Sequence, residues 1–323
     1  MAVLVTGGAG YIGGHVVRVL QSAGRDVAVL DDLSTGRADR VPGVPFLRAD
    51  LAEPATVPAL TAFCVRERVD AVVHLAARKR VDESVARPQW YARQNVGGTA
   101  HLLAAMSGAG VDRLVLSSSA AVYGSPATPL VAEAAPTEPV NPYGETKLAC
   151  ERMLAETRGL HSIALRYFNV AGATSGILRD DTEANLVTTV LARLARGRAP
   201  EIFGDDYPTP DGTCVRDLVH VADVADAHLC ALQALERGTP APSRAYNVGT
   251  GRGVSVREIA ERLVALVRPG LTADVRERRL GDPAAVVADV SRIRGELGWT
   301  ARYDVDATLR SASEAVRDLS AVR

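Results

Sequence analysis

Apolar and polar positions are arranged in alternating blocks through the first half of the chain. Short apolar runs predict buried strands at residues 3–5, 26–31, 44–48, 70–75 and 112–117. Longer stretches with helical spacing of apolar residues lie between them and predict helices at about 14–24, 54–68 and 92–108. Strands that alternate with helices predict an α/β fold with a parallel, doubly wound sheet of the Rossmann type.

The second half of the chain has a more mixed pattern. From about residue 165 it combines short strand-like runs with helical stretches, and residues 204–212 are rich in Gly, Pro and Asp. We therefore expect a nucleotide-binding domain at 1–168. Residues 169–323 are expected to form mainly a smaller α/β substrate-binding lobe, with some segments returning to the first sheet.

A glycine-rich turn follows the first predicted strand. Gly7, Gly8, Gly10 and Gly13 precede a helix, and the second strand ends in Asp31, about 20 residues beyond the glycines. This order is the dinucleotide-binding fingerprint: glycine lets the backbone approach a pyrophosphate, and the helix N-terminus attracts it. An acid at position 31 accepts hydrogen bonds from ribose hydroxyls and repels a 2′-phosphate, which favours NAD over NADP.

Ligands of doubly wound sheets bind beyond the carboxyl ends of the strands. Here those ends fall at Gly7, Asp31, Asp50, Ala76 and the run 117–119. The sequence therefore predicts that the ligand site lies along this edge.

A Tyr-x-x-x-Lys pair begins a later helix. Asn141 suits its N-cap and Pro142 its first position, so Tyr143 and Lys147, four residues apart, project from one helical face. A nearby ammonium favours the phenolate, so we expect the pKa of Tyr143 to be lowered and Tyr143 to act as a base. Ser119, at the end of the fifth strand, supplies a hydroxyl to orient the substrate oxygen.

Composition narrows the function classes. The 37 basic and 38 acidic residues nearly cancel, so no global field attracts nucleic acid or a membrane surface. The four cysteines show no metal-ligand spacing and favour a reducing, cytoplasmic setting, and the first residues leave no room for a signal peptide. Only two of the 37 basic residues are lysines, Lys79 and Lys147.

These patterns together resemble the extended short-chain dehydrogenase/reductase family and, within it, the UDP-glucose (UDP-galactose) 4-epimerases. The resemblance covers nearly the whole chain. It is carried by the segments 6–13, 74–84, 95–99, 117–124, 141–147, 165–169, 202–207, 211–217 and 246–249.

The resemblance implies a tightly bound NAD, Tyr143 as the base, Lys147 as its modulator and ribose anchor, and a homodimer. NAD would contact Gly7, Gly10, Tyr11, Ile12, Gly13, Asp31, Asp32, Ser34, Thr35, Gly36, Asp50, Leu51, Leu75, Ala76, Ala77, Lys79, Asn95, Ser117, Tyr143, Lys147 and Phe168. A UDP-sugar would contact Lys79, Ser119, Tyr143, Asn169, Asn185, Leu186, Phe203, Arg216, Arg279 and Asp282.

Three positions bear on the reaction and on the sugar. Related dehydratases and decarboxylases carry acids where this chain has Ala120 and Ala121, and alanine does no acid–base work, so epimerisation is expected. Val286 aligns with the position that limits space beside the sugar's C2 substituent, which leaves the preferred sugar open. The alternatives are a 4-epimerase of UDP-N-acetylglucosamine, UDP-glucuronate or UDP-xylose, a net oxidoreductase that releases NADH, and a non-catalytic NAD sensor.

Overall fold

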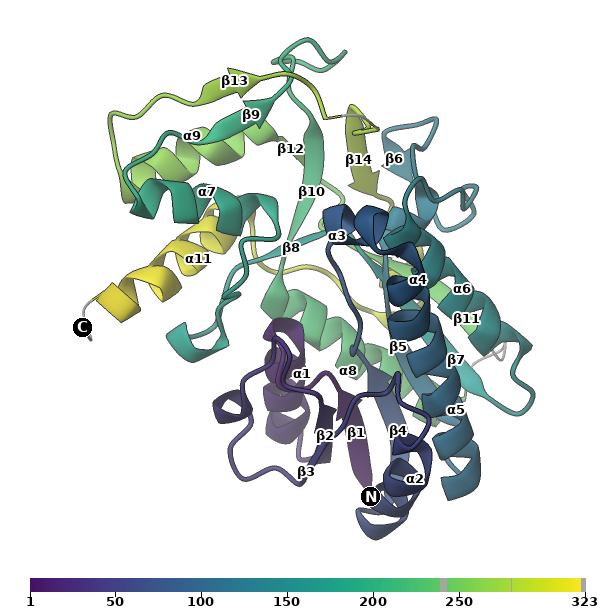
Figure 1. Cartoon of the computed structure of the whole chain (residues 1–323). Helices are drawn as coiled ribbons and strands as arrows, with labels where there is room; N and C mark the ends of the chain where they lie inside the picture. Colours follow the sequence, from purple (N-terminus) through teal and green to yellow (C-terminus); the bar gives the residue numbers. More distant parts are fainter. Residues whose placement is uncertain (239–242, 280, 321–323) are drawn as a thin grey trace.

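The computed structural model describes residues 1–238, 243–279 and 281–320, and its main feature is a seven-stranded parallel sheet (Figure 1). The strand order is β11-β7-β5-β4-β1-β2-β3, and every neighbouring pair is parallel. The strands are β1 Ala2–Thr6, β2 Asp26–Asp31, β3 Phe46–Arg48, β4 Val69–His74, β5 Arg113–Ser119, β7 His161–Tyr167 and β11 Ser243–Val248. The predicted doubly wound α/β fold is confirmed.

Helices cover both faces of this sheet. One face packs against α1 Tyr11–Ser22 and α8 Val221–Arg237, and the other against α2 Thr56–Arg66, α5 Gly98–Ala109 and α6 Pro142–Glu156. Each face has its own apolar core, because β-branched and leucine side chains alternate sides along every strand. The short helices α3 Val81–Ala86 and α4 Pro88–Tyr91 lie between β4 and α5.

The remaining elements build a smaller second region. A five-stranded sheet contains β6 Leu130–Val131, β8 Asn169–Ala171, β10 Val215–His220, β12 Gly253–Ser255 and β14 Ala285–Ala288, and β9 Glu201–Phe203 pairs with β13 Asp274–Arg276. The helices α7 Leu186–Ala195, α9 Val256–Val267 and α11 Val305–Ser320 share an apolar cluster, and α10 Ser291–Leu297 packs beside α8 and β11. Because α8, α10 and β11 pack in the first region, a boundary after residue 168 stays a prediction.

Two predicted elements differ in detail. The strand predicted from residue 44 starts at Phe46, because Pro45 has no N–H to give to the ladder; its carbonyl still accepts from Val29 N at 2.8 Å. The helix predicted at 92–108 begins with a π-helical stretch, Ala92–Gly97, before regular α-helix follows. The helix opened by Asn141 is as predicted: Asn141 Oδ1 accepts from Gly144 N at 2.9 Å.

Candidate active site

A cleft lies at the carboxyl edge of β1, where the strand order reverses between β4 and β2. The cleft has about 1020 Å³ of space, part of it open to solvent, and the glycine turn forms its floor. A Cβ on Gly13 would lie 2.1 Å from Gly7 O, and one on Gly7 would lie 2.7 Å from Ala76 N. The turn therefore admits no side chain at either position and leaves its backbone open to a ligand.

Most predicted cofactor residues line this cleft. They are Gly7, Gly10, Tyr11, Ile12, Gly13, Asp31, Asp32, Ser34, Thr35, Asp50, Leu51, Leu75, Ala76, Ala77, Lys79, Ser117, Tyr143 and Lys147. The backbone and side-chain donors at this edge fit the phosphates, ribose hydroxyls and amide of a dinucleotide. The residues present therefore fit NAD.

Three predicted cofactor residues are not among the residues that line the cleft. Gly36 lies beside the Asp31 carboxylate, so that an added Cβ would meet Asp31 Oδ1 at 2.7 Å. Asn95 is buried and bonds Arg78 N at 2.8 Å, Arg78 O at 3.1 Å and Thr146 Oγ1 at 3.0 Å, so its amide holds a loop. Phe168 is buried in an apolar cluster with Val122 and Tyr123.

Asp31 has a structural role as well as the predicted one. Its carboxylate accepts from Ala9 N at 3.0 Å and from Leu33 N at 2.8 Å, which ties the glycine turn to the segment after β2. Burial raises its pKa, while these backbone donors act in the opposite direction. Each carboxylate oxygen keeps a free lone pair for a ribose hydroxyl.

The Tyr-Lys pair lies on the first two turns of α6, facing the cleft. Lys147 is 5% exposed, its Nζ donates to Ser117 O at 2.8 Å, and it lies 5.9 Å from the centre of the Tyr143 ring. Burial lowers the pKa of Lys147. The compact ammonium is thus held between the end of β5 and the phenol.

The expected lowering of the Tyr143 pKa is wrong for the protein without ligands. Burial raises the pKa of this phenol, and the Ser119 hydroxyl only partly offsets that effect. The ammonium of Lys147 is directed to the Ser117 carbonyl, so it does not bond the phenol oxygen.

A buried ion pair anchors α6 beneath these groups. Glu151, one turn beyond Lys147, accepts from Arg166 Nε at 3.0 Å and from Arg166 Nη2 at 2.6 Å, and Ser118 Oγ also donates to it. Arg166 Nη1 in turn donates to Tyr123 Oη at 2.9 Å. Glu151 of α6 is therefore joined to Ser118 near the end of β5 and to Arg166 near the end of β7.

Ser119 lies at the end of β5 but does not line the cleft floor. Its Oγ accepts from Ala121 N at 3.2 Å and caps the 3₁₀ turn Ala120–Tyr123. No carboxylate occupies positions 120 and 121, as the sequence already required.

The predicted nucleotide-end residues come together in two pairs between β9, β10 and the segment before β14. Arg216 Nη2 lies 3.4 Å from Asp282 Oδ1, and the Arg279 guanidinium lies 3.9 Å from the centre of the Phe203 ring. Arg216 Nη1 also donates to Pro283 O at 2.8 Å. Both guanidinium forks are thus placed on one side of the second region, as a diphosphate site requires.

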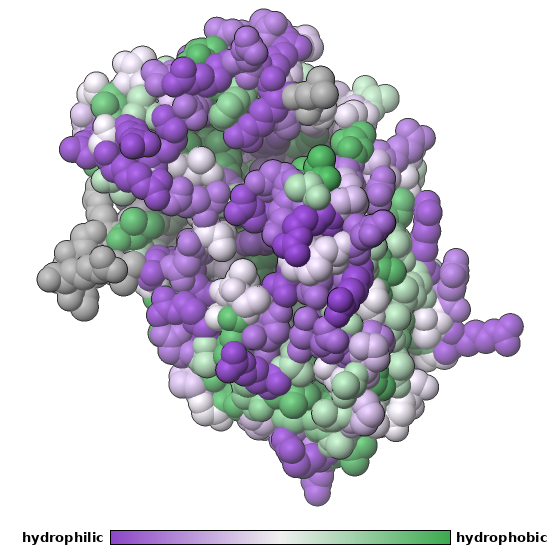
Figure 2. Space-filling view, viewed as in Figure 1, coloured by the Kyte–Doolittle hydropathy of each residue, from purple (hydrophilic) through white to green (hydrophobic). Residues whose placement is uncertain are grey.

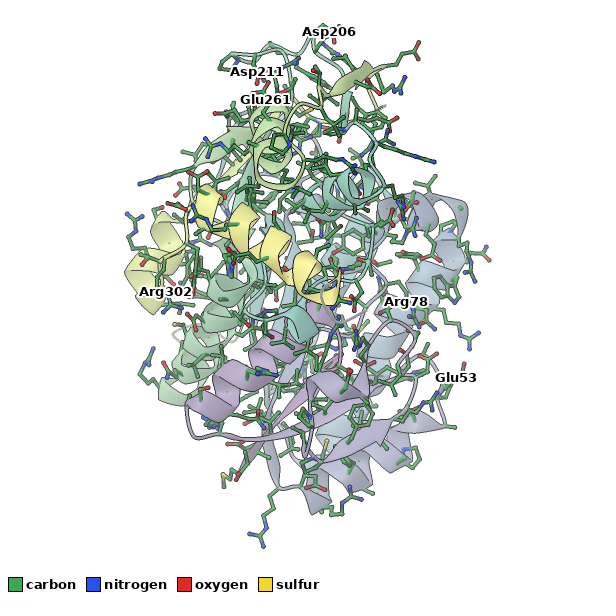
Figure 3. The ribbon with its side chains drawn as sticks, turned by 90° about the vertical axis from the view of Figure 1, so that its left-hand side faces the viewer. Glu53, Arg78, Asp206, Asp211, Glu261 and Arg302 are labelled. Carbon is green, nitrogen blue, oxygen red and sulfur yellow. The ribbon has the colours of Figure 1, made fainter. Side chains whose placement is uncertain are left out.

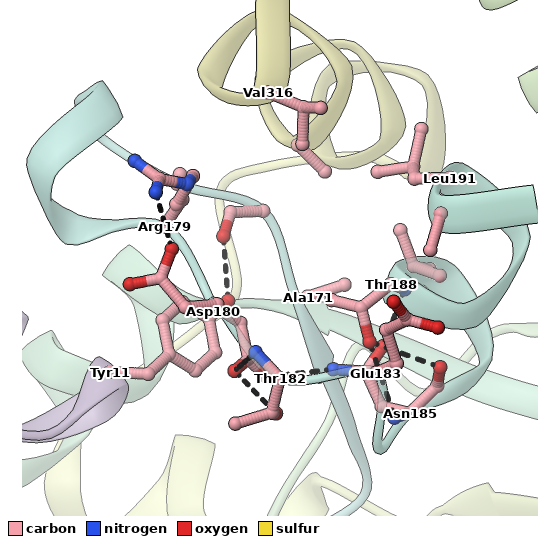
Figure 4. A pocket seen from close by; sticks show the side chains of 16 residues that line it. Tyr11, Ala171, Arg179, Asp180, Thr182, Glu183, Asn185, Thr188, Leu191 and Val316 are labelled. Atoms are coloured by element: carbon pink, nitrogen blue, oxygen red, sulfur yellow. Dashed lines mark hydrogen bonds and ion pairs between the residues drawn. The ribbon is translucent and has the colours of Figure 1, made fainter. Parts of the chain in front are cut away.

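A second cavity lies behind the segment that follows β8 (Figure 4), with about 700 Å³ of space between that segment, α7 and α11. Asn185 caps α7 by accepting from Thr188 N at 2.9 Å and donates to Asp180 Oδ2 at 3.0 Å. Lys79 Nζ approaches the same oxygen at 3.4 Å. Asp180 therefore links a predicted cofactor residue to a predicted substrate residue.

The remaining predicted substrate positions lie on the second region. Leu186 begins α7 and packs against the α7–α9–α11 cluster, and Asn169 begins β8 and pairs with Leu218 of β10. Val286 of β14 pairs with Arg216 of β10 and packs against the apolar cluster that contains Val122, Tyr123 and Phe168.

Five further residues line the cleft that sequence reasoning missed: Leu30, Ala49, Arg78, Gln94 and Tyr167. Tyr167 donates to buried His228 Nε2, whose Nδ1 bonds Val224 O at 2.9 Å. Arg78 stands beside Lys79, but one arginine among 35 gives no signal of its own. The contacts of Arg78 and Gln94 link segments far apart in the sequence, so no local pattern reveals them.

Comparisons with known proteins agree with this geometry. The family model for the NAD dependent epimerase/dehydratase family matches residues 3–249. The chain is 45% identical to the UDP-glucose 4-epimerase of Azospirillum brasilense over 98% of this chain and 92% of that protein. It is 46% identical to the one from Streptomyces lividans over 92% and 90%.

A solved structure gives the same result. The structure of the UDP-glucose 4-epimerase of Stenotrophomonas maltophila, with bound NAD and formylated UDP-arabinopyranose, is 40% identical in sequence. The alignment covers 100% of each chain, with a TM-score of 0.92. The chain belongs to the NAD-dependent epimerase/dehydratase family. Within that family it is one of the UDP-glucose 4-epimerases, which are NAD-using isomerases. In the described part of the chain, no helix is long and apolar enough to cross a membrane.

Proposed function

We propose that this enzyme interconverts UDP-glucose and UDP-galactose by inverting C4 through a 4-keto sugar, with Tyr143 as the base. The observation that carries the proposal is the pairing of Tyr143 with buried Lys147 on α6, at the mouth of a cleft that fits NAD. NAD, when bound, accepts a hydride from C4 and returns it.

The chain's own residues handle the proton and the orientation. Tyr143 takes the proton from the C4 hydroxyl, Ser119 holds that oxygen, and Tyr143 returns the proton when C4 is reduced from the other face. Inversion needs the keto sugar to turn while the nucleotide stays bound. The paired anchors Arg216–Asp282 and Arg279–Phe203 support this, because they act on the nucleotide end and leave the sugar without a rigid clamp.

The alanines at 120 and 121 support epimerisation over elimination. Loss of water or of a carboxylate needs an acid or base near C5 and C6, and Ala120 and Ala121 offer only methyl groups at the start of the turn after Ser119. The preferred sugar depends on the space beside Val286. A relative from Campylobacter jejuni that is 36% identical is described as a UDP-Glc/GlcNAc 4-epimerase, so N-acetylated sugars belong in the substrate panel.

The test supplies UDP-galactose to purified enzyme without added NAD. We expect UDP-glucose to form, no net NADH to accumulate, and the Tyr143→Phe variant to lose about 10²–10⁴-fold in rate while keeping its bound NAD. Tyr303→Phe is the matched control, because that exposed tyrosine stacks on His220 outside the cleft. A Tyr143→Phe enzyme with full activity would refute the assignment, and steady NADH release would favour the oxidoreductase.

We also propose that the enzyme is a cytoplasmic homodimer. The four cysteines are free thiols, which suits a reducing compartment. Apolar residues remain partly or fully exposed on the outer faces of α5 and α6, including Leu103, Ala104 and Met153. Figure 2 shows green and pale residues toward the side where Figure 1 has α5. Light scattering during gel filtration should give twice the 34.0 kDa chain mass, and a monomer mass would refute the dimer.

A further inference from the structure

One side chain that lines the cleft, Arg78 (labelled in Figure 3), joins segments that follow two different strands of the first sheet. Arg78 lies on the segment that leaves β4, and its Nη2 donates to Asp32 Oδ2 at 2.6 Å on the segment that leaves β2. Its Nη1 also donates to Ser34 Oγ. Since β1 lies between β4 and β2 in the sheet, the Arg78 side chain bridges the two segments on either side of β1, whose glycine turn is the cleft floor.

A second contact extends this bridge to β3. Arg78 Nε donates to Gln94 Oε1 at 2.9 Å, and Gln94 Nε2 donates to Asp50 Oδ2 at 3.2 Å. The four side chains Asp32, Arg78, Gln94 and Asp50 form a continuous chain of hydrogen bonds, and all four line the cleft. An acid after the second strand marks the adenosine-ribose end of a dinucleotide site, so the chain lies at that end.

The backbone of Arg78 is held by one residue, and its side chain is held only by polar and ring contacts that rotation can break. Asn95 bonds both Arg78 N at 2.8 Å and Arg78 O at 3.1 Å. The Arg78 side chain is 18% exposed, and its guanidinium carbon lies 5.3 Å from the Trp90 ring centre. Opening the bridge therefore needs only rotation about the side chain and the loss of its charge-assisted hydrogen bonds.

We propose that Arg78 is a latch over the adenosine end of the cleft, and that its opening sets the rate at which NAD enters and leaves. This inference rests on NAD being the cofactor of the proposed reaction. That reaction returns NAD to its starting state in each cycle, so turnover does not require release of NAD. Slow opening of the latch therefore does not lower the rate of turnover.

The test measures NAD exchange directly, without using activity. Enzyme loaded with labelled NAD is diluted into excess unlabelled NAD, and retained label is followed by rapid gel filtration. Arg78→Met keeps the length of the side chain but removes the fork. We expect release to accelerate roughly tenfold or more, because each hydrogen bond to a charged group contributes substantially to the closed state. Association should accelerate by a similar factor, leaving the Kd little changed.

Arg80→Met is the matched control. Arg80 lies two residues away on the same segment, but it is 54% exposed and pairs with Asp82 instead of lining the cleft. Its exchange rate should match the wild type. Arg78→Lys, which keeps one charge but not the fork, should fall between wild type and Arg78→Met, and it serves if the methionine variant folds poorly.

Three results would overturn the latch. They are unchanged release in Arg78→Met, equal acceleration in Arg80→Met, and faster release with unchanged or slower association, which would make Arg78 a direct cofactor contact. A wild-type enzyme that holds NAD but does not epimerise would instead contradict the proposed function and leave the exchange measurement valid.

Discussion

The Glu151–Arg166 pair offers a demanding test of how the catalytic helix is held. Glu151 is 10% exposed and Arg166 8% exposed, and three N–H···O contacts of 3.0, 3.2 and 2.6 Å join them. Burial works against the charge on Arg166, but the Glu151 carboxylate outweighs it and raises the pKa of Arg166. Glu151→Gln keeps the shape of the side chain and removes the negative charge.

Removing one partner of a buried pair leaves an uncompensated charge, at a cost of about 3–5 kcal/mol in unfolding free energy. Glutamine keeps one carbonyl oxygen to accept from Arg166, so we expect a loss near the lower limit, about 3 kcal/mol. Turnover should fall as well, because Ser118, which donates to Glu151, lies between the Lys147 acceptor Ser117 and Ser119.

Urea unfolding of the NAD-loaded enzyme, followed by circular dichroism, measures the difference. Glu53→Gln is the control: Glu53 pairs with Arg93, both are more than half exposed, and its loss should change the unfolding free energy by about 0–1 kcal/mol. A Glu151→Gln variant no less stable than this control would refute the view that the buried pair anchors α6.

Two further predictions follow from burial. Four histidines have pKa values lowered by burial to about 3 or 4, against 6.5 when unfolded: His15, His74, His220 and His228. Between pH 6.5 and 4 the unfolded chain then binds more protons than the folded chain. The unfolding free energy is therefore highest above pH 6.5 and falls below it, by up to about 1.4 kcal/mol per pH unit for each histidine. A urea midpoint that does not change from pH 7 to 4.5 would contradict this. Lys147→Arg should reduce turnover at least about tenfold, and the amount of NAD bound to the variant is measured alongside. The Lys147 site holds one Nζ 2.8 Å from Ser117 O, so a guanidinium there would leave buried donors unpaired. Near-normal turnover would show that the site accepts an arginine.

Local pattern was sufficient for the glycine turn and for β1 to β5, but β7 and β11 of the same sheet were not individually predicted. β1, the turn at Gly7 to Gly13, α1 and β2 are consecutive, so apolar runs and glycine spacing determined them without knowledge of the rest. The same holds for α6, whose N-cap and Tyr-Lys spacing are contained in seven residues. The lengths of β3 and of the helix after α4 were less accurate, because a proline and a π-helical stretch changed hydrogen bonding within an otherwise regular pattern.

Side-chain pairings between segments distant in the sequence could not be predicted from local pattern. Arg78 meets Asp32 and Gln94, and Arg166 meets Glu151, only after the sheet has formed, and 35 arginines give no reason to select these two. Asn95 also makes contacts that its sequence position did not indicate. The resemblance placed Asn95 among the NAD contacts, and that stays a prediction; in the structure its amide bonds the Arg78 backbone.

The two lysines of this arginine-rich chain occupy different environments, and the difference decides what their identity means. Lys147 is 5% exposed with a carbonyl acceptor at 2.8 Å, where a planar fork with five donors would lack partners. Lys79 is 49% exposed and approaches Asp180 at 3.4 Å, a setting that an arginine also tolerates. Packing therefore explains lysine at position 147 alone. At position 79 packing imposes no such requirement, because the ammonium is half exposed and its Asp180 partner accepts equally from a guanidinium.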